Sequence, residues 1–271
     1  MSRIRTCFEE LKRRREVALV PFIMAGDPDL GVTEALLRAA VEAGADLIEL
    51  GVPFSDPTAD GPVLQRSAAR ALQRGTSLSR ILELVAKLRP EVAVPIILFG
   101  YYNPIFHYGP ARLVEDAKRA GVDGLLVVDL PPEEADELWQ PARAAGVDMI
   151  FLLAPTSDAR RVRAVLRKAS GFVYYVSMTG VTGAKAIEPT DVRPLVERVR
   201  ADCALPIGVG FGISSGREAA AVAEFTDAVI VGSAIMRLVE AHHADANVAD
   251  RVGAFMRELK DATRKPAPVA A

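Results

Sequence analysis

Short apolar runs alternate along the chain with longer stretches in which apolar residues recur at helical spacing. The runs are apolar at consecutive positions, which is typical of strands buried on both faces of a parallel sheet. Eight strands are predicted: Val17–Met24, Asp46–Gly51, Val94–Phe99, Gly124–Val128, Asp148–Leu153, Gly171–Ser177, Pro206–Gly210 and Ala228–Gly232. The predicted helices are Ile4–Arg15, Leu30–Ala43, Pro62–Leu88, Ala111–Ala120, Glu133–Ala145, Ala159–Lys168, Pro189–Ala201, Ser215–Phe225 and Val248–Arg264, with a short one from Gly232 to about Glu240.

One short phrase recurs where a predicted helix meets a predicted strand. It reads Gly-X-Asp, and it occurs at Gly44–Asp46, Gly121–Asp123 and Gly146–Asp148, each time directly before an apolar run. Glycine tolerates a positive φ and commonly follows the last residue of a helix. The phrase therefore indicates the helix-to-strand joint of a parallel sheet.

Eight strands that alternate with helices predict an α/β protein of the (β/α)₈ or TIM-barrel class, with an open doubly wound sheet as the alternative. No Gly-x-Gly-x-x-Gly follows the first strand, which argues against a dinucleotide-binding sheet. The length of 271 residues agrees with the usual size of one barrel, about 250 residues. We expect a single barrel domain over residues 1–265, an extra helix before the first strand, and a disordered tail over 266–271.

Composition narrows the class of protein. Half of the residues are apolar, a quarter are charged, and the net charge is −2, so a nucleic-acid-binding surface is not indicated. The basic run Lys12–Arg15 is interpreted as the solvated face of a helix, with a targeting or polyanion-binding patch as the alternative. The N-terminal residues lack the apolar core of a secretory signal, and Cys7 and Cys203 have no metal-ligand spacing. We expect a soluble, cytoplasmic protein with reduced thiols.

Three glycine-rich segments follow the predicted strands 6, 7 and 8. In a barrel, these positions lie at the mouth, where phosphate groups often bind. Glycine lets backbone N–H groups approach an anion, and a helix N-terminus adds a positive partial charge. The candidate phosphate-binding residues are Thr182, Gly183, Phe211, Gly212, Gly232 and Ser233.

Glu49 interrupts an otherwise apolar strand near its C-terminal end. Alternation places it on the face of Leu47, opposite Ile48 and Leu50, so it points into the barrel if those two pack under the helices. A structural ion pair is the alternative to a catalytic role. Asp60 lies in the next loop and is either the partner of Glu49 in acid–base chemistry or only a turn or helix cap.

Two kinds of catalysis are disfavoured by what the sequence lacks. The three histidines lie away from the predicted strand ends, so a His-ligated metal is not expected. No lysine lies within a predicted strand, and the nearest, Lys185, is in the loop after the sixth; a Schiff-base mechanism is not expected either. Acid–base catalysis by carboxylates on a phosphorylated substrate remains.

The chain resembles the α subunits of tryptophan synthase. The resemblance rests on Phe22–Pro28 and, above all, on Leu47–Pro62, which contains Pro-Phe-Ser-Asp-Pro-x-Ala-Asp-Gly-Pro. Further matching segments, in the same order, are Tyr101–Pro104, Asp129–Pro131, Gly180–Gly183, Gly208–Gly212 and Gly232–Ala234. The chain departs from some relatives at Met178-Thr179, where others carry an arginine.

The resemblance implies cleavage of indole-3-glycerol phosphate to indole and glyceraldehyde 3-phosphate. It implies Glu49 as the general acid–base, Asp60 as the acceptor of the indole N–H, and Tyr174 in a supporting hydrogen bond. Indole-pocket walls are expected at Phe22, Tyr101 and Leu126.

The resemblance also implies a partner, a β subunit in an α2β2 heterotetramer. The residues expected at that interface are Pro53, Asp56 and Pro57. No cofactor is expected in this chain, and pyridoxal phosphate (PLP) would belong to the β subunit. A free-standing indole-releasing lyase, a catalytically inactive activator subunit and a triose-phosphate-type isomerase are the alternatives.

Overall fold

The strands close into a barrel in which every neighbouring pair is parallel and the strand order follows the sequence. The computed structural model describes residues 2–176, 189–210 and 212–264. The strands are β1 (Ala18–Met24), β2 (Ile48–Gly51), β3 (Ile96–Gly100), β4 (Gly124–Val127), β5 (Asp148–Leu153), β6 (Val173–Val176), β7 (Ile207–Gly210) and β8 (Ala228–Val231). The predicted barrel is confirmed. The alternative, an open doubly wound sheet, is wrong because β1 pairs with β8.

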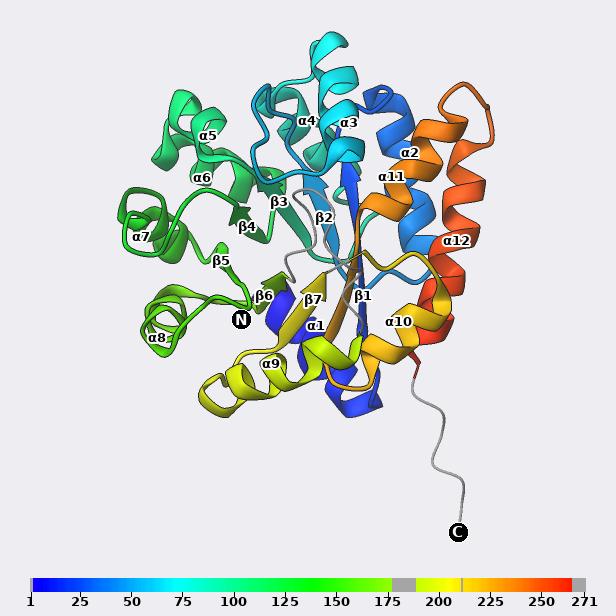
Figure 1. Ribbon diagram of the computed structural model, residues 1–271. Coiled ribbons are helices and arrows are strands. Elements are labelled where there is room, and N and C mark those ends of the chain that lie inside the picture. Colours follow the sequence, from blue (N-terminus) through cyan, green and yellow to red (C-terminus); the bar gives the residue numbers. More distant parts are fainter. Residues whose placement is uncertain (1, 177–188, 211, 265–271) are drawn as a thin grey trace.

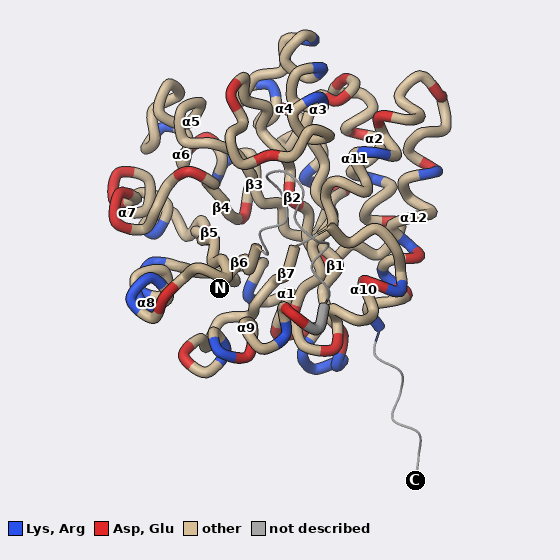
Figure 2. Tube along the Cα trace, in the orientation of Figure 1, with Lys and Arg blue, Asp and Glu red and all other residues tan. Residues whose placement is uncertain are grey.

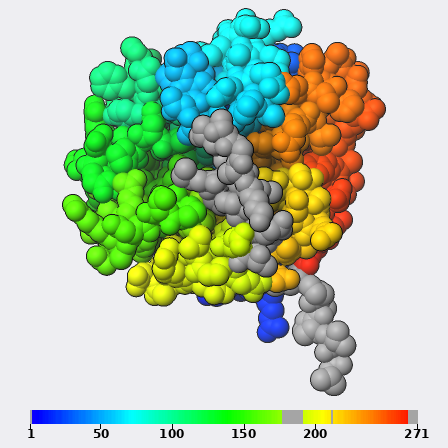
Figure 3. Space-filling model, viewed as in Figure 1, coloured from blue at the N-terminus to red at the C-terminus, as the bar shows by residue number. Residues whose placement is uncertain are grey.

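Apart from α1, the helices surround the barrel, and the colours of the chain run around the molecule from cyan through green and yellow to red (Figures 1 and 3). The helices are α1 (Arg3–Arg14), α2 (Leu30–Glu42), α3 (Pro62–Gln73), α4 (Leu78–Leu88), α5 (Tyr102–Tyr108), α6 (Pro110–Ala120), α7 (Asp136–Ala145), α8 (Ala159–Lys168), α9 (Pro189–Asp202), α10 (Gly216–Ala223), α11 (Ser233–His242) and α12 (Val248–Thr263). The predicted extra N-terminal helix and the short helix after the last strand are confirmed as α1 and α11.

Two helix predictions need correction. The single helix predicted over Pro62–Leu88 is two helices, because Gly75 adopts φ +72° and Ser77 caps α4 by accepting a hydrogen bond from the Arg80 N–H. Helix α5 was not predicted at all. Its first residue, Tyr102, donates its backbone N–H to Asp129, a cap supplied from 27 residues away, and no local sequence pattern reveals such a cap.

The repeated Gly-X-Asp phrase forms the joints that the sequence predicts. Gly44, Gly121 and Gly146 have φ of +87°, +96° and +67°, which a residue with a side chain adopts only with strain. Each lies between the last turn of a helix and the start of the next strand.

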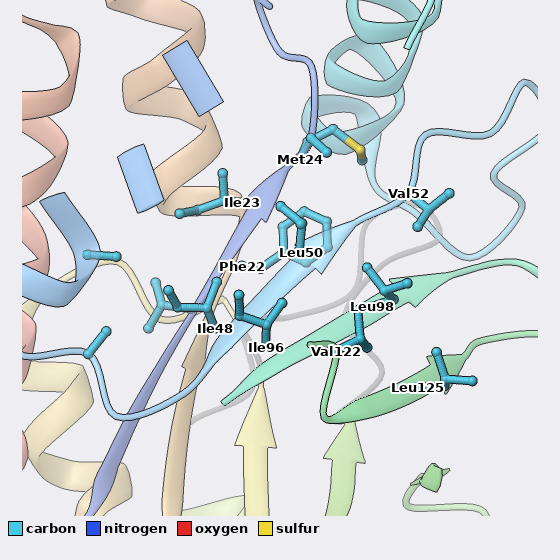
Figure 4. Packing of buried hydrophobic residues seen from close by; sticks show 14 of the residues in the cluster. Phe22, Ile23, Met24, Ile48, Leu50, Val52, Ile96, Leu98, Val122 and Leu125 are labelled. Carbon is cyan, nitrogen blue, oxygen red and sulfur yellow. The ribbon is translucent and has the colours of Figure 1, made fainter. Parts of the chain in front are cut away.

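The core has two layers, and alternation along each strand assigns residues to one or the other. Outward residues such as Ile48 and Leu50 pack with neighbouring strands and the surrounding helices (Figure 4). Inward residues fill the barrel, and α1 covers its lower end with Ile4, Phe8 and Leu11. The barrel is thus filled below its mouth, which leaves the C-terminal strand ends as the place for a site.

No helix in the described part of the chain has the length and apolar character to cross a membrane. The predicted tail lies outside the described residues.

Candidate active site

Glu49 lies on the inner face of the barrel, as alternation predicts. Leu47 belongs to the inner core layer, while Ile48 and Leu50 belong to the outer one. In the strand register, Glu49 stands beside Phe22 of β1 on one side and Ile97 of β3 on the other.

The Glu49 carboxyl is wholly buried, at 0% exposure, and neither oxygen has a hydrogen-bond partner among the described residues. The alternative that Glu49 forms a structural ion pair is therefore wrong for the part of the chain that the structure describes. Burial disfavours the charged form and raises the pKa of Glu49 from 4.5 to about 8. At neutral pH the group is mainly a carboxylic acid, able to donate a proton.

Asp60 lies in the loop after β2, and burial raises its pKa to about 6, with a smaller opposing effect from a hydrogen bond to Tyr101. It does not cap α3: Gly61 is the N-cap residue, and no side chain caps this helix. The helix-cap alternative is wrong, and the carboxylate remains mainly ionised at neutral pH. Glu49 and Asp60 thus favour opposite protonation states.

Tyr101 braces the loop that carries Asp60. Its hydroxyl accepts a hydrogen bond from the Ala59 N–H at 3.0 Å, and its ring lies 5.4 Å from that of Phe54. Sequence reasoning expected Tyr101 only as an apolar wall, whereas its hydroxyl also holds the backbone beside the carboxylate.

Tyr174 on β6 leans over β7. Gly210 allows this approach, because a Cβ at that position would lie 2.1 Å from the Tyr174 hydroxyl oxygen. Burial, followed by the charges of Glu49 and Asp60, raises the pKa of Tyr174 well above its ordinary value. The phenol therefore stays protonated, and the three predicted catalytic groups lie within electrostatic reach at one end of the barrel.

An apolar wall accompanies these polar groups. Phe22 and Leu126 are 4% and 0% exposed, and the Phe22 ring stands edge-on to Phe99 with centroids 5.2 Å apart. The absence of a side chain at Gly51 gives the Phe22 ring its space, since a Cβ there would lie 2.5 Å from the ring.

The structure describes part of the loops predicted to bind phosphate. Gly212 is exposed at φ +33°, with open space where a side chain would project. Gly232 is the N-cap of α11, and no side chain caps the N–H groups of the first turn, which begins with Ser233. These N–H groups are suited to an anion. Thr182, Gly183 and Phe211, as well as Met178 and Thr179, lie outside the described residues.

The loop expected to meet a partner divides into a buried and an exposed part. Pro53 is buried within this chain, Pro57 is half-buried, and Asp56 is exposed. The Ser55 hydroxyl donates a hydrogen bond to Asp56.

An ionic network that sequence reasoning missed joins the elements around the site. Asp27, wholly buried after β1, accepts two hydrogen bonds from Arg70 of α3, each 2.7 Å long, and one from Ser67. Arg70 also donates to Glu240 of α11, which pairs with Arg66 as well. The only signal in the sequence was an aspartate three residues after the end of an apolar strand. Among the described residues, no three His, Cys, Asp or Glu side chains are arranged to hold a metal ion.

Comparison with known proteins identifies the family. The sequence profile described as "Tryptophan synthase alpha chain" matches residues 8–264. The chain belongs to the tryptophan synthase alpha chain family. Members of this family are lyases of tryptophan biosynthesis, and this chain is one of them.

Relatives and solved structures agree with membership over the whole length. The tryptophan synthase alpha chain of Geobacter sp. (strain M21) is 53% identical over 265 residues, which cover 98% of this chain and 99% of the relative. The crystal structure of the alpha subunit from Legionella pneumophila str. Paris is 39% identical, with a TM-score of 0.91, covering 97% of this chain and 98% of that one. A structure of Mycobacterium tuberculosis tryptophan synthase is 34% identical, with a TM-score of 0.89, covering 98% and 99%.

Proposed function

We propose that this chain cleaves indole-3-glycerol phosphate to indole and glyceraldehyde 3-phosphate by acid–base catalysis, with Glu49 as the acid and base. The observation that carries the proposal is the Glu49 carboxyl, buried without a partner on the inner barrel face. A buried ionisable group that no structural contact explains is a candidate for catalysis.

The proposed reaction begins with Glu49 in its protonated form. The acid donates its proton to C3 of the indole, and Asp60 accepts the indole N–H and stabilises the positive charge that develops on the ring. The Glu49 carboxylate then takes the proton of the hydroxyl on the carbon being released. The C–C bond breaks, its electron pair returns to the indole ring, and the aldehyde forms. Tyr174, held protonated, donates a supporting hydrogen bond at the reacting centre.

This route needs neither an imine nor a metal, because the protonated indole is itself the electron sink. The substrate phosphate is placed at Gly212, Gly232 and Ser233, where backbone N–H groups and the N-terminus of α11 favour an anion. Phe22 and Leu126 supply apolar contacts for the indole.

The proposed partner is a tryptophan synthase β subunit, in an α2β2 heterotetramer. PLP belongs to that subunit, which consumes the indole released here, and the exposed Asp56 with Pro57 forms part of the contact. The proposed location is the cytoplasm, where the thiols of Cys7 and Cys203 stay reduced.

The test is indole release by Glu49→Gln, which keeps the size of the side chain and removes its proton chemistry. A group that serves two proton transfers is worth at least about 10²–10⁴-fold, so the variant should lose that much kcat. Glycerol 3-phosphate affinity should stay at the wild-type value and serves as the control for folding. Release within about tenfold of wild type would contradict the role of Glu49.

Adding a β subunit to the same assay separates the remaining alternatives. A large rise in release supports a subunit of a complex. Release that does not respond indicates a free-standing lyase, and no release under either condition indicates an inactive activator or a triose-phosphate-type isomerase.

A further inference from the structure

Three aspartates at strand starts obey one structural rule. Each donates its backbone N–H to a carbonyl at the start of an adjacent strand, and its carboxylate accepts the N–H of that same residue. The pairs are Asp46 with Leu19, Asp123 with Ile96 and Asp227 with Ile207, with N–Oδ2 distances of 2.8, 2.9 and 2.9 Å.

A basic side chain forms an ion pair with each of these three aspartates. Lys260 lies 2.8 Å from Asp46, Arg89 lies 3.3 Å from Asp123, and Arg200 lies 2.9 Å from Asp227. Asp46 and Asp123 are buried, at 9% and 6% side-chain exposure, and each carboxylate is both hydrogen-bonded and paired, which is the condition for burying it without a large loss of stability. Asp227 makes the same contacts but is 36% exposed.

Asp148, at the start of β5, occupies the corresponding position in the third Gly-X-Asp phrase and breaks the rule. Its backbone N–H donates to the Asp123 carbonyl, but the Asp123 N–H already donates to Ile96, so the return bond cannot form. No cation pairs with Asp148 among the described residues. The side chain is nine-tenths buried, and its Oδ2 atom has no hydrogen-bond partner there.

Asp148 lines a hollow of about 1200 Å³ at the end of the barrel opposite to Glu49. The hollow lies between α1 and the loops that precede β4, β5, β6 and β7. Four basic side chains line it without an ion pair in the described part of the chain: Lys12, Lys118, Arg143 and Arg167. Arg143 is held over the Trp139 ring at 5.2 Å, and the basic character of α8 is visible in Figure 2.

We propose that this hollow binds a polyanionic organic phosphate that also carries an N–H donor, the combination found in nucleotides. The phosphates meet the four unpaired basic groups, and an amino or imino group of the base donates to the Asp148 carboxylate. Carboxylates accept hydrogen bonds from the amino groups of bases. The basic run that includes Lys12 then has a ligand-binding role in addition to a solvated face.

Charge and size favour this class over simpler anions. Four cations spread over α1, α6, α7 and α8 surround more space than one inorganic phosphate fills, and ligand sites for organic molecules commonly measure about 300–1,000 Å³. An anion without a donor would face the negative charge of Asp148, which lines the hollow and has no cation of its own among the described residues.

The test is equilibrium dialysis of the full chain with ATP, GTP, inorganic tripolyphosphate and adenosine. Saturating glycerol 3-phosphate is present, so that the mouth of the barrel is occupied. At least one nucleotide should bind roughly tenfold more tightly than tripolyphosphate, because a hydrogen bond to a charged group separates them. Adenosine should bind more weakly than either.

Variants distinguish a specific nucleotide site from non-specific binding of anions to exposed basic side chains. Asp148→Asn should abolish the preference for the nucleotide over tripolyphosphate, while the affinity for tripolyphosphate stays equal or improves; a thermal melt checks the fold of the variant.

Arg167→Ala should lower the affinity for both ligands by about two- to fivefold. Its matched control is Arg163→Ala, an exposed arginine of the same helix that does not line the hollow. Absence of binding, equal affinity for nucleotide and tripolyphosphate in the wild type, or an equal effect of both arginine variants would overturn the proposal.

Discussion

Glu49 is mainly protonated at neutral pH, whereas a carboxyl group in water is ionised. It is fully buried, its oxygens have no partner among the described residues, and its pKa is raised to about 8 because burial disfavours the charge. Asp60, less deeply buried and bonded to Tyr101, has a pKa of about 6. Two environments thus leave two carboxyl groups in opposite protonation states at neutral pH, as the roles proposed for them require.

The raised pKa of Glu49 predicts a pH-dependent effect on stability. A carboxyl group with a folded-state pKa above its ordinary value stabilises the fold fully below 4.5, and this contribution is lost as the pH rises to about 8. Gln does not titrate, so Glu49→Gln should gain stability relative to wild type across this window, by up to roughly 5 kcal/mol. Urea unfolding of both proteins at pH values below, within and above the window measures it. A stability difference independent of pH would show that burial of Glu49 has no such effect.

The same two groups predict a bell-shaped dependence of kcat/KM on pH. Asp60 must be ionised, so activity rises through about pH 6; Glu49 must be protonated, so activity falls above about pH 8. Initial rates of indole release over this range test it, with Asp60→Asn as the comparison. That variant should lose the acidic limb and keep the basic one. Activity that continues to rise well above pH 8 would contradict the acid role of Glu49.

At the scale of elements, the Asp27–Arg70–Glu240 network fixes three segments to one another. Arg70 connects the end of β1 with α3, which begins just after Asp60, and with α11, which begins at the proposed phosphate site. Hydrogen bonds from Arg66 and Arg70 lower the pKa of Glu240 to about 2, so its charge persists at neutral pH. The network therefore holds α3, the helix that follows Asp60, against α11, the helix that begins at the proposed phosphate site.

Two arginines of this network should differ in their contribution to the free energy of unfolding. Arg70→Ala leaves the wholly buried Asp27 without its cation, and breaking such a pair costs about 3–5 kcal/mol. Arg66 is about half exposed, and its ion pair in the described part of the chain is with Glu240 alone, so Arg66→Ala should cost less than about 1 kcal/mol. Urea denaturation compares the two variants. Similar losses for both would mean that burial of Asp27 does not decide the effect.

At the scale of the molecule, the closed barrel separates two ends with different roles. All strands run parallel, so Glu49, Asp60 and the start of α11 meet at the mouth. The opposite end is covered by α1 and carries the hollow beside Asp148. The contact proposed for the β subunit involves the loop that bears Asp60, at the mouth, and leaves the other end of the barrel free.

This separation predicts which surface charge influences activation by a β subunit. Asp56→Ala should leave basal indole release near the wild-type value. It should measurably lower the affinity for the β subunit, since the residue is exposed on the loop proposed for the contact. Glu10→Ala, an exposed acidic residue of α1 at the other end, is the matched control. Titration of indole release with β subunit measures both. Equal partner affinity in the two variants would move the contact away from this loop.

The sequence by itself determined the barrel, its joints and the face on which Glu49 lies. These are local properties: strand alternation fixes which side chains share a face, and Gly44, Gly121 and Gly146 end helices through their own backbone freedom. The break at Gly75 was also local, and a long run of helix-forming residues concealed it.

Only the tertiary structure decided which groups have partners. Asp46 and Asp148 stand in the same phrase of the sequence, yet Asp46 is paired with Lys260, while Asp148 is buried without a cation among the described residues, because pairing depends on residues distant in the chain. For the same reason, the pKa values of Glu49 and Asp60, the cap of α5 by Asp129 and the Asp27–Arg70–Glu240 network were not readable from local pattern. Hydrophobic periodicity is set by neighbours along the chain, whereas desolvation and charge are set by neighbours in space.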